Sequence, residues 1–322
     1  MSPRQAWLIC ACFAIVAVAP ASNAAPQTKL SVAKVANDFA LSMVNYGNKL
    51  GTFQKNGLDV EVSNITQAKM IQAVIGGSID VALASGATLA FASKGAPLNG
   101  VAALSGPPSI LVLVVGTRSP IKSLDGLRGR TVAVTNLGSL TDWAVSQIAL
   151  REKWAPSNIK RVSVGDTAAR IAALRTGAAD AAVVDIAAAL NLEERDEARI
   201  LVNFGDLINN FQNQIIYASN KLIQSNPGAV RGFIHAWFAT LDYARTHKAE
   251  TVAFSQQQLG LTPAVAARVY DELMPGGFFS SDGRFDTGIL RALSRSFVEL
   301  KLLDHDVDLS QYVTDRFLVN ER

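Results

Sequence analysis

The sequence contains little of what metal-dependent and thiol-dependent proteins need. Only two of its 322 residues are cysteines, Cys10 and Cys12, and both lie in an N-terminal apolar run. The rest of the chain therefore has no thiolate for nucleophilic attack, zinc binding or disulfide formation. Three histidines occur, His235, His247 and His305, and no two have the spacing of a zinc-binding helix. We expect no metal site.

Charge and nucleotide-binding motifs are scarce as well. Charged residues make up 18% of the chain, and 30 Lys and Arg against 27 Asp and Glu leave a formal net charge of +3. The basic residues are scattered and form no stripe that could follow a phosphate backbone, so we expect no nucleic-acid partner. The chain also lacks a phosphate-binding loop, a dinucleotide fingerprint and a GxSxG nucleophile elbow. We therefore expect no cofactor and a protein that is not an enzyme.

One long hydrophobic run is present, at the N-terminus. Arg4 precedes an unbroken apolar stretch from Trp7 to Ala19, and Ser22-Asn23-Ala24 follows it as a small-x-small cleavage pattern. This arrangement is typical of a secretory signal peptide. The stretch is too short for a membrane helix, which needs about 20 apolar residues. We expect cleavage after Ala24 and export of the remaining chain, which then contains no cysteine.

The rest of the sequence alternates apolar stretches with helical segments, and one series of them occurs twice. The stretches predicted to be strands are Leu30–Val35, Leu58–Ile65, Val81–Ala84 and Gly100–Leu104, then Thr131–Thr135, Arg161–Val164, Ala181–Val184 and Ile200–Phe204. Strands that alternate with helices in this way indicate parallel βαβ units. We expect an α/β fold of two lobes, each a mostly parallel sheet flanked by helices. A single large doubly wound sheet is the alternative.

The two series also share a local phrase, at a spacing of 100 residues. Gly77-Ser78-Ile79-Asp80-Val81-Ala82 in the first series corresponds to Gly177-Ala178-Ala179-Asp180-Ala181-Ala182 in the second. In each, we expect the glycine to end a helix in the left-handed conformation and the aspartate to open a buried strand. The phrase supports two lobes of one design.

Two apolar stretches join the lobes, and a helical segment follows. We expect Ile110–Gly116 and Ile215–Ala218 to be extended crossings that act as a hinge. Beyond Asn226 the pattern predicts helices alone, packed back on the first lobe. The predicted division is a signal peptide over 1–24, the first part of lobe 1 over 25–115, lobe 2 over 116–217, and a helical return segment over 218–322.

Short polar residues and glycines follow the predicted strands. In open α/β sheets, ligands bind beyond the carboxyl ends of the strands, because loops converge there and the next helices direct free N–H groups into the crevice. The candidate ligand-binding residues at these positions are Asn37, Phe39, Ser85, Gly86 and Thr88 in the first lobe, and Gly138, Ser139, Thr141, Arg170 and Asp185 in the second.

Several of these residues also have a purely structural interpretation. Ser139, with Asp142 three residues on, has the spacing of a capping box, which serves a helix end as readily as an anion. Arg170 offers a guanidinium fork for an anionic group, or lies solvated on a helix face. Phe39 fits a cleft wall or the core, and Asp185 fits a ligand contact or a helix cap.

An ordered series of short motifs resembles one known family. The motifs are Gly57–Val62, Gln72–Asp80, Gly95–Leu98, Ile121–Arg130, Gly138–Asp142, Asn226-Pro227 and Asp282–Phe285. Together they resemble the periplasmic substrate-binding proteins of ABC importers in the nitrate, sulfonate and taurine group. That group shares a domain with thiamine-pyrimidine biosynthesis proteins. The resemblance extends over essentially the whole chain after the predicted signal peptide.

The resemblance implies a two-lobed periplasmic binding protein fold of type II, with a ligand held between the lobes. It implies a small anionic or polar solute, a periplasmic location, and a membrane permease and an ATPase as partner subunits; we expect a monomer. Ser139 and Thr141 match the family's pattern best, followed by Ser85 and Asn37, while Arg170 matches no motif. Two alternatives stay open: an enzyme of pyrimidine-precursor synthesis on the same fold, and a periplasmic ligand sensor.

Overall fold

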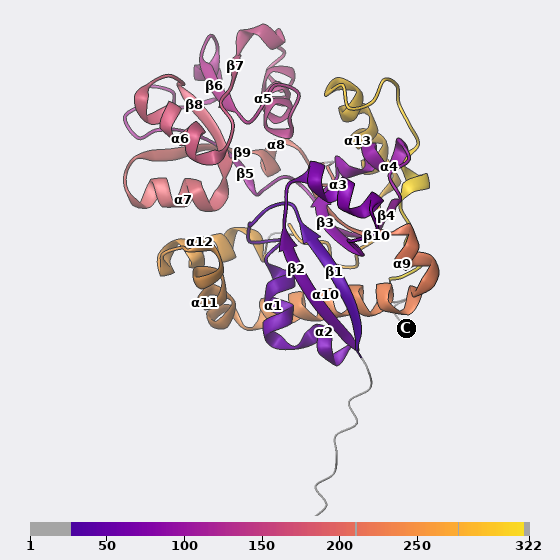
Figure 1. Ribbon diagram of the computed structural model, residues 1–322. Coiled ribbons are helices and arrows are strands. Elements are labelled where there is room, and N and C mark those ends of the chain that lie inside the picture. The colour runs from indigo at the N-terminus through magenta and orange to yellow at the C-terminus, as the bar shows by residue number, and fades with distance from the viewer. Residues whose placement is uncertain (1–26, 210, 276, 319–322) are drawn as a thin grey trace, which may run out of the picture.

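The computed structural model describes residues 27–209, 211–275 and 277–318, and these form two lobes, each built on one five-stranded sheet (Figure 1). The sheet of lobe 1 has the order β2 (Leu58–Asn64), β1 (Thr28–Lys34), β3 (Val81–Ser85), β10 (Gln214–Ser219), β4 (Leu98–Ser105). The sheet of lobe 2 has the order β7 (Lys160–Ser163), β6 (Thr131–Val134), β8 (Ala181–Asp185), β5 (Leu111–Gly116), β9 (Ala198–Asn203). The predicted two-lobed α/β fold is confirmed. The predicted signal peptide lies outside the described residues.

Helices flank both sheets. Lobe 1 carries α1 (Met43–Leu50), α2 (Thr52–Lys55), α3 (Gln67–Ile75) and α4 (Thr88–Ser93), and later α9 (Asn220–Ser225), α10 (Pro227–Thr246), α11 (Lys248–Leu259), α12 (Pro263–Leu273), α13 (Thr287–Glu299) and the 3-10 turn η3 (Leu309–Tyr312). Lobe 2 carries α5 (Leu140–Arg151), α6 (Thr167–Thr176), α7 (Ile186–Glu194) and α8 (Phe204–Leu207), with the 3-10 turns η1 (Leu124–Leu127) and η2 (Pro156–Asn158). Within the described residues, no helix combines the length and the apolar character that a membrane crossing requires.

The repeated phrase occupies the same place in both lobes. Gly77 and Gly177 follow helices α3 and α6 with φ of 72° and 76°, as predicted. Two hydrogen bonds join Asp80 to Ser31. The N–H of Ser31 donates to Oδ2 of Asp80 at 2.9 Å, and the N–H of Asp80 donates to the carbonyl of Ser31 at 2.9 Å. Asp180 makes the same two bonds to Thr131, at 2.9 and 2.8 Å. Each aspartate therefore joins the start of one central strand to its parallel neighbour.

The fourth strand of each sheet corrects the predicted lobe boundaries. β5 pairs antiparallel with β8 and β9 inside lobe 2, and β10 pairs antiparallel with β3 and β4 inside lobe 1. The two crossings exist, but they precede these strands; their described residues are 106–110 in the first and 208, 209 and 211–213 in the second. The limits predicted at 115 and 217 are therefore several residues too late. An apolar run is buried best with a neighbour on each edge, so both stretches lie inside sheets rather than between lobes.

The segment after Asn226 differs from its prediction in two respects. It is not all helical, because residues 277–286 and 300–318 contain turns, one 3-10 turn and isolated bridges from Phe279 to Ser105 and from Val313 to Gly100. It also packs on both lobes. Helix α10 lies along α1 and α2 of lobe 1, whereas α12 contacts α7 of lobe 2 (Figure 1).

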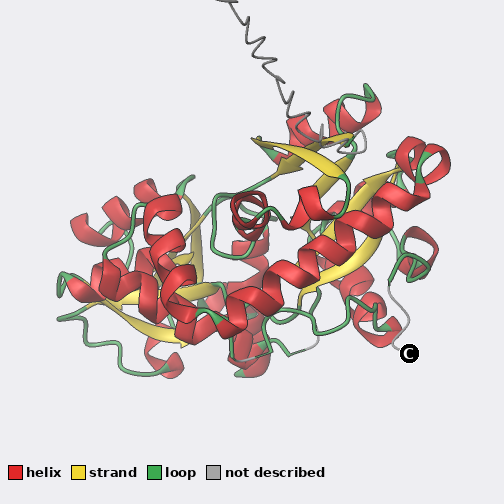
Figure 2. Cartoon of the chain, turned by 90° about the horizontal axis from the view of Figure 1, so that it is seen from below, coloured by secondary structure: helices red, strands yellow, loops and turns green. Residues whose placement is uncertain are grey.

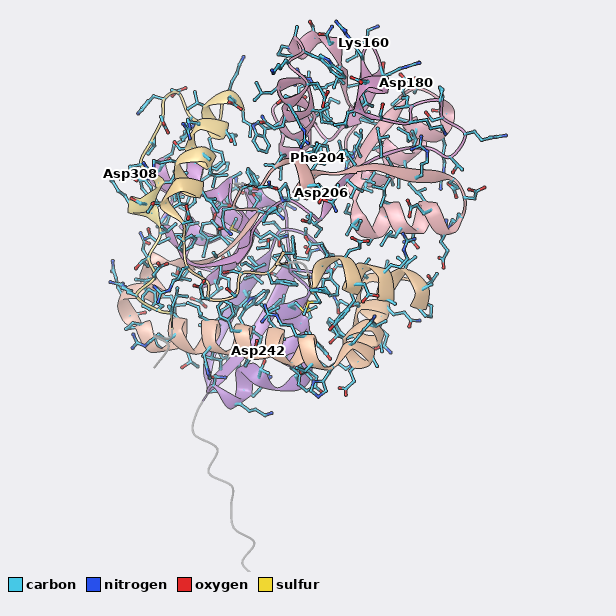
Figure 3. All side chains as sticks on the ribbon, turned by 180° about the vertical axis from the view of Figure 1, so that it is seen from behind. Lys160, Asp180, Phe204, Asp206, Asp242 and Asp308 are labelled. Atoms are coloured by element: carbon cyan, nitrogen blue, oxygen red, sulfur yellow. The ribbon has the colours of Figure 1, made fainter. Side chains whose placement is uncertain are left out.

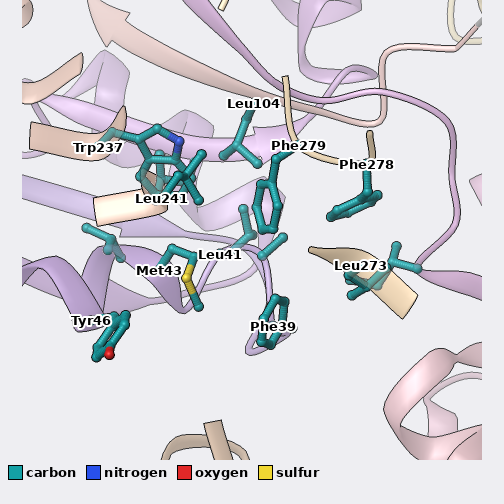
Figure 4. Packing of buried hydrophobic residues seen from close by; sticks show 14 of the residues in the cluster. Phe39, Leu41, Met43, Tyr46, Leu104, Trp237, Leu241, Leu273, Phe278 and Phe279 are labelled. Carbon is teal, nitrogen blue, oxygen red and sulfur yellow. The ribbon is translucent and has the colours of Figure 1, made fainter. Parts of the chain in front are cut away.

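Helix α10 shows why this segment belongs to the core of lobe 1. Its apolar residues Val230, Phe233, Ile234, Trp237 and Leu241 recur three and four positions apart, and all are at most 1% exposed. The helix crosses beneath the first sheet (Figure 2), and Trp237 and Leu241 reach the packed layer shown in Figure 4. The return of the chain therefore completes a core that the first part of lobe 1 leaves open.

Candidate functional site

The carboxyl ends of the parallel strands in the two sheets lie toward each other, and two cavities open between them. The first, which we call the serine cavity, has a volume of about 240 Å³. Its lining comes from both lobes, one crossing and the return segment: Gln67, Ser85, Gly86, Ala87, Phe91, Gly138, Ser139, Leu140, Phe211, Phe297, Leu300 and Leu302. Four candidate residues from opposite lobes, Ser85 and Gly86 with Gly138 and Ser139, thus line one space.

The second, which we call the aspartate cavity, has a volume of about 200 Å³. It is lined by Asn37, Asp38, Phe39, Ile110, Asp185, Ile186, Ala187, Ala188, Asn191, Leu259, Leu261 and Val269. Three further candidates, Asn37, Phe39 and Asp185, lie here. The serine cavity lies beyond the ends of β3 and β6, and the aspartate cavity lies beyond the ends of β1 and β8. Since β1 is next to β3 and β8 is next to β6, the two cavities are neighbours.

A larger hollow of about 490 Å³ lies at the other end of lobe 2, and it is less suited to a site between lobes. Its lining includes Gly116, Asp180 and Ala198, at the edge of the sheet where β8 begins. All of its lining residues come from lobe 2. In Figure 3, Asp180 lies on the outer part of that lobe, whereas Phe204 and Asp206 of α8 lie at the junction of the lobes.

The loop before α5 is held by a compact set of polar contacts. Ser139 caps the helix, with its Oγ accepting the N–H of Asp142 at 3.4 Å, and Asp142 in turn receives the N–H of Gly138 at 2.9 Å. The Thr141 hydroxyl lies 2.9 Å from that of Ser139 and accepts the N–H of Thr135 at 2.9 Å. Ser139 lines the serine cavity. Thr141 does not line it; this residue is 7% exposed, and its hydroxyl contacts the loop that precedes α5.

The loop before α4 is fixed by contact with the second crossing. Gly86 donates its N–H to the carbonyl of Asn213 at 2.9 Å, and a Cβ at Gly86 would lie 2.2 Å from the carbonyl oxygen of Gln212. Only glycine permits this approach. Ser85 places its hydroxyl 3.4 Å from Oε1 of Gln67 at the cavity wall. The candidate Thr88 is completely buried in the first turn of α4 and does not line either cavity.

Arg170 lies neither on a solvated face nor on the wall of either cavity. It is 5% exposed. Its Nε donates to the carbonyl of Val183 at 2.7 Å, and its terminal nitrogens donate to Thr135 Oγ1 at 2.7 Å, to the carbonyl of Gly165, and to Thr167 Oγ1 at 3.0 Å. Burial lowers the pKa of the guanidinium, while the carboxylates of Asp185 and Asp166 oppose this shift. Both sequence interpretations of Arg170 therefore miss its burial.

The aspartate cavity contains a carboxylate that the candidate set omitted. Asp38 accepts the N–H of Leu41 at 2.7 Å and the Nε2 donor of Gln214 at 3.0 Å. Burial, and secondarily the charge of Asp185, raise the pKa of Asp38 to about 6. Nearby, the buried ammonium of Lys34 donates to Asn37 Oδ1 at 2.7 Å, and burial lowers its pKa.

Two other candidates have structural contacts in addition to their place in this cavity. Asp185 caps α7 by accepting the N–H of Ala188 at 2.9 Å. Phe39 is 2% exposed and packs on Phe279, with 6.2 Å between ring centroids, so most of the ring belongs to the core of lobe 1 (Figure 4).

The lining of the serine cavity includes residues that sequence reasoning missed. Phe297, Leu300 and Leu302 come from α13 and the turn after it, more than 150 positions from Ser139. Their apolar spacing predicts a helix face but not which lobe or cavity that face meets. Among the described residues, no group of three or more His, Cys, Asp or Glu side chains is arranged to hold a metal ion.

Solved structures with the same architecture define the class of the fold. The alkanesulfonate-binding protein SsuA from Xanthomonas axonopodis pv. citri, bound to MOPS, has a TM-score of 0.74 at 18% identity, over 90% of this chain and 99% of that one. The periplasmic aliphatic sulphonate binding protein SsuA from Escherichia coli has a TM-score of 0.76 at 19% identity, over 91% and 94%. The desulfurization enzyme DSZB has a TM-score of 0.61 at 18% identity, over 90% and 97%. The chain therefore has the periplasmic binding protein fold.

The sequence itself identifies the family. Residues 40–251 match the model of the NMT1/THI5-like family, so the chain belongs to that family. No curated protein sequence matches it.

Proposed function

We propose that the protein is the periplasmic solute-binding subunit of an ABC importer, and that it holds a small organic anion of the sulfonate type between its lobes. The observation that carries this proposal is the serine cavity, in which hydroxyls from opposite lobes, Ser85 and Ser139, line one space. The names of the sulfonate-binding structures with this fold support the same class of ligand.

The charge of the ligand follows from the start of α5. Leu140 and Thr141 are its first two residues, so their N–H groups have no acceptor within the helix. A helix start of this kind favours a negative group by about 0.3 to 1 kcal/mol, and by more where the site is partly buried. Ser139 adds a hydroxyl beside these donors.

The apolar wall favours an organic body over a bare ion. Phe91, Leu140, Phe211, Phe297 and Leu300 line the same cavity as the two serines. Covering apolar atoms of a ligand is worth about 25 cal/mol for each Å² removed from water. Sulfonates with a larger apolar body should therefore bind more tightly than nitrate, which has no apolar part, or taurine, whose short body ends in a charged ammonium.

Capture requires the lobes to close on the solute. The crossings contribute Ile110 to one cavity and Phe211 to the other, so rotation about them changes both spaces. A ligand shifts this equilibrium only if it binds the closed form more tightly than the open form. Contacts from both lobes to one ligand meet that condition, and a membrane permease with its ATPase would receive the closed form.

Calorimetric titration of residues 25–322 tests the proposal, with hexane-1-sulfonate, MOPS, taurine and sodium nitrate as probes. We expect a dissociation constant of about 1–10 µM for hexane-1-sulfonate or MOPS, equivalent to about −8 to −7 kcal/mol, and a smaller radius of gyration in X-ray scattering. Ser139→Ala should weaken binding about tenfold, whereas Ser225→Ala, at an exposed position of α9, serves as the matched control. Flat titrations with all four probes and unchanged scattering would refute the proposal.

An enzyme on this fold is the alternative, favoured by the similarity to DSZB. The lining of the serine cavity includes no Cys, His or Lys among the described residues, so it lacks the usual nucleophile or Schiff-base groups. An absorbance spectrum with one equivalent of pyridoxal phosphate tests a Schiff-base enzyme: a specific site would keep a new band through gel filtration, whereas a binding protein would lose the compound.

A further inference from the structure

Arg170 joins three segments at the carboxyl edge of the lobe 2 sheet. Three of its hydrogen bonds go to acceptors on β8, just after β6 and in the loop before α6, and a fourth goes to Thr167, the first residue of α6. A guanidinium has five N–H donors in a fixed plane, so these contacts use most of its capacity. Arg170 does not line either cavity.

A continuous path of hydrogen bonds leads from Arg170 to the serine cavity. The guanidinium donates to the hydroxyl of Thr135 at 2.7 Å, and the N–H of Thr135 donates to the hydroxyl of Thr141 at 2.9 Å. That hydroxyl lies 2.9 Å from the hydroxyl of Ser139, which lines the cavity. The path therefore connects a buried charge on α6 to the residue that faces the ligand space from α5.

We propose that Arg170 is a positioning residue for the solute, one that holds the loop 135–139 so that Ser139 and the start of α5 face the cavity. This inference rests on the proposed function of the serine cavity. It replaces direct ligand contact by Arg170 with action through Thr135 and Thr141. Preorganisation of this kind strengthens binding, because the loop does not have to be ordered when the solute arrives.

The chemistry of the contacts explains why arginine occupies this place. Its planar fork reaches acceptors on separate segments at once, whereas a lysine ammonium has three donors at a single point. The charge is balanced locally by the carboxylates of Asp166 and Asp185, which raise the pKa of Arg170 against the effect of burial. Lysine at this position would keep the charge but lose part of the contact set.

Two variants at Thr135 separate positioning from a general loss of stability. Thr135→Val removes the hydroxyl that accepts from Arg170, whereas Thr135→Ser keeps it. Arg170→Lys tests the fork itself. Arg175→Gln is the matched control, because Arg175 lies on the same helix with its side chain 52% exposed and paired with Glu197.

Hydrogen exchange of the ligand-free protein gives the first readout and needs no ligand. We expect Arg170→Lys and Thr135→Val to raise the exchange rates of amides 135–139 by about tenfold, with Thr135→Ser and Arg175→Gln within about twofold of the wild type. Unchanged exchange in Thr135→Val and Arg170→Lys would overturn the proposal, and if Arg170→Lys fails to fold, the pair of Thr135 variants decides.

Titration with hexane-1-sulfonate gives the second readout. We expect Thr135→Val to weaken its dissociation constant by about three- to tenfold and Thr135→Ser to keep it, a pattern that direct contact by Arg170 would not give. Faster exchange in Thr135→Val without weaker binding would overturn the link to the solute. If the wild type binds none of the four probes, the proposed function fails, while the exchange result still decides whether Arg170 positions the loop.

Discussion

The two lobes agree closely where their central strands begin and differ where those strands end. At the beginning, Asp80 and Asp180 make the same pair of hydrogen bonds to Ser31 and Thr131. The strand orders also correspond, with β2-β1-β3-β10-β4 in one lobe and β7-β6-β8-β5-β9 in the other. The two lobes therefore share the same strand order and the same contacts at the strand starts.

At the strand ends, the two lobes hold their loops by different means. Lobe 1 uses the contact of Lys34 with Asn37 and of Asp38 with Gln214 at the start of β10. Lobe 2 uses the path from Arg170 to Ser139 within its own segments. If the solute binds at the strand ends, as proposed, the shared strand starts carry stability and the divergent strand ends carry recognition.

The largest expected effect comes from Gly86, and Gly138 in the facing cavity loop provides the comparison. Gly86→Ala places a Cβ 2.2 Å from the carbonyl oxygen of Gln212, so backbone must move, and we expect a loss of about 3 kcal/mol in the free energy of unfolding. Gly138→Ala meets no close atom but has φ of 78°, which costs about 1 kcal/mol. Urea unfolding measures both, and equal losses would contradict the account of a loop fixed by the crossing.

The two scaffold aspartates should have the next largest effect, and an equal one. Asp80→Ala and Asp180→Ala each leave a backbone N–H without its carboxylate acceptor, which we expect to cost about 2 kcal/mol. Asp304→Ala, at an exposed position, is the control. Chemical unfolding of the three variants tests the correspondence of the lobes, and a loss at one aspartate alone would break it.

The third effect is a pH dependence located in lobe 1. Because the pKa of Asp38 is raised to about 6 in the folded protein, this group contributes stability that is full below the unfolded pKa and is lost as the pH rises through about 6. Asp38→Asn removes the titration. We expect the wild type to lose about 1–2 kcal/mol more than this variant between pH 5 and pH 8, measured by urea unfolding. Parallel pH profiles would show that Asp38 ionises without penalty.

The smallest effect concerns a contact between the lobes. Arg268 on α12 pairs with Glu193 on α7 at 2.8 Å, and the side chains are 49% and 24% exposed. An exposed pair contributes about 0.2–1 kcal/mol. Arg268→Gln should therefore change the free energy of unfolding by no more than about 0.5 kcal/mol in thermal or chemical unfolding. A loss above 1 kcal/mol would indicate that this pair holds the lobes together.

On the other side of the molecule, the lobes meet through a more buried contact. Trp143 on α5 stacks on Phe211 with 4.9 Å between ring centroids and donates its indole N–H to Glu299 on α13 at 3.0 Å. Trp143 is 5% exposed, so its fluorescence provides a natural measure of lobe closure.

Local sequence patterns predicted the strands and helices and the common architecture of the two lobes, because hydrophobic periodicity and helix caps depend on residues that are close in sequence. The phrase containing Asp80 and Asp180 and the cap at Ser139 were predicted in this way. The place of β5 and β10 was not, because an apolar run has the same pattern in the middle of a sheet as between lobes. The burial of Arg170 was missed for a related reason, since its acceptors come from segments up to 35 residues away.

The most direct test of the central claim is a crystal structure of the protein bound to hexane-1-sulfonate, or to a solute that copurifies with it. We predict that the anionic group lies between Ser85 of lobe 1 and Ser139 of lobe 2, with its apolar part against Phe91 and Phe297. A ligand that contacts one lobe alone, or that lies in the hollow beside Gly116, would contradict the account.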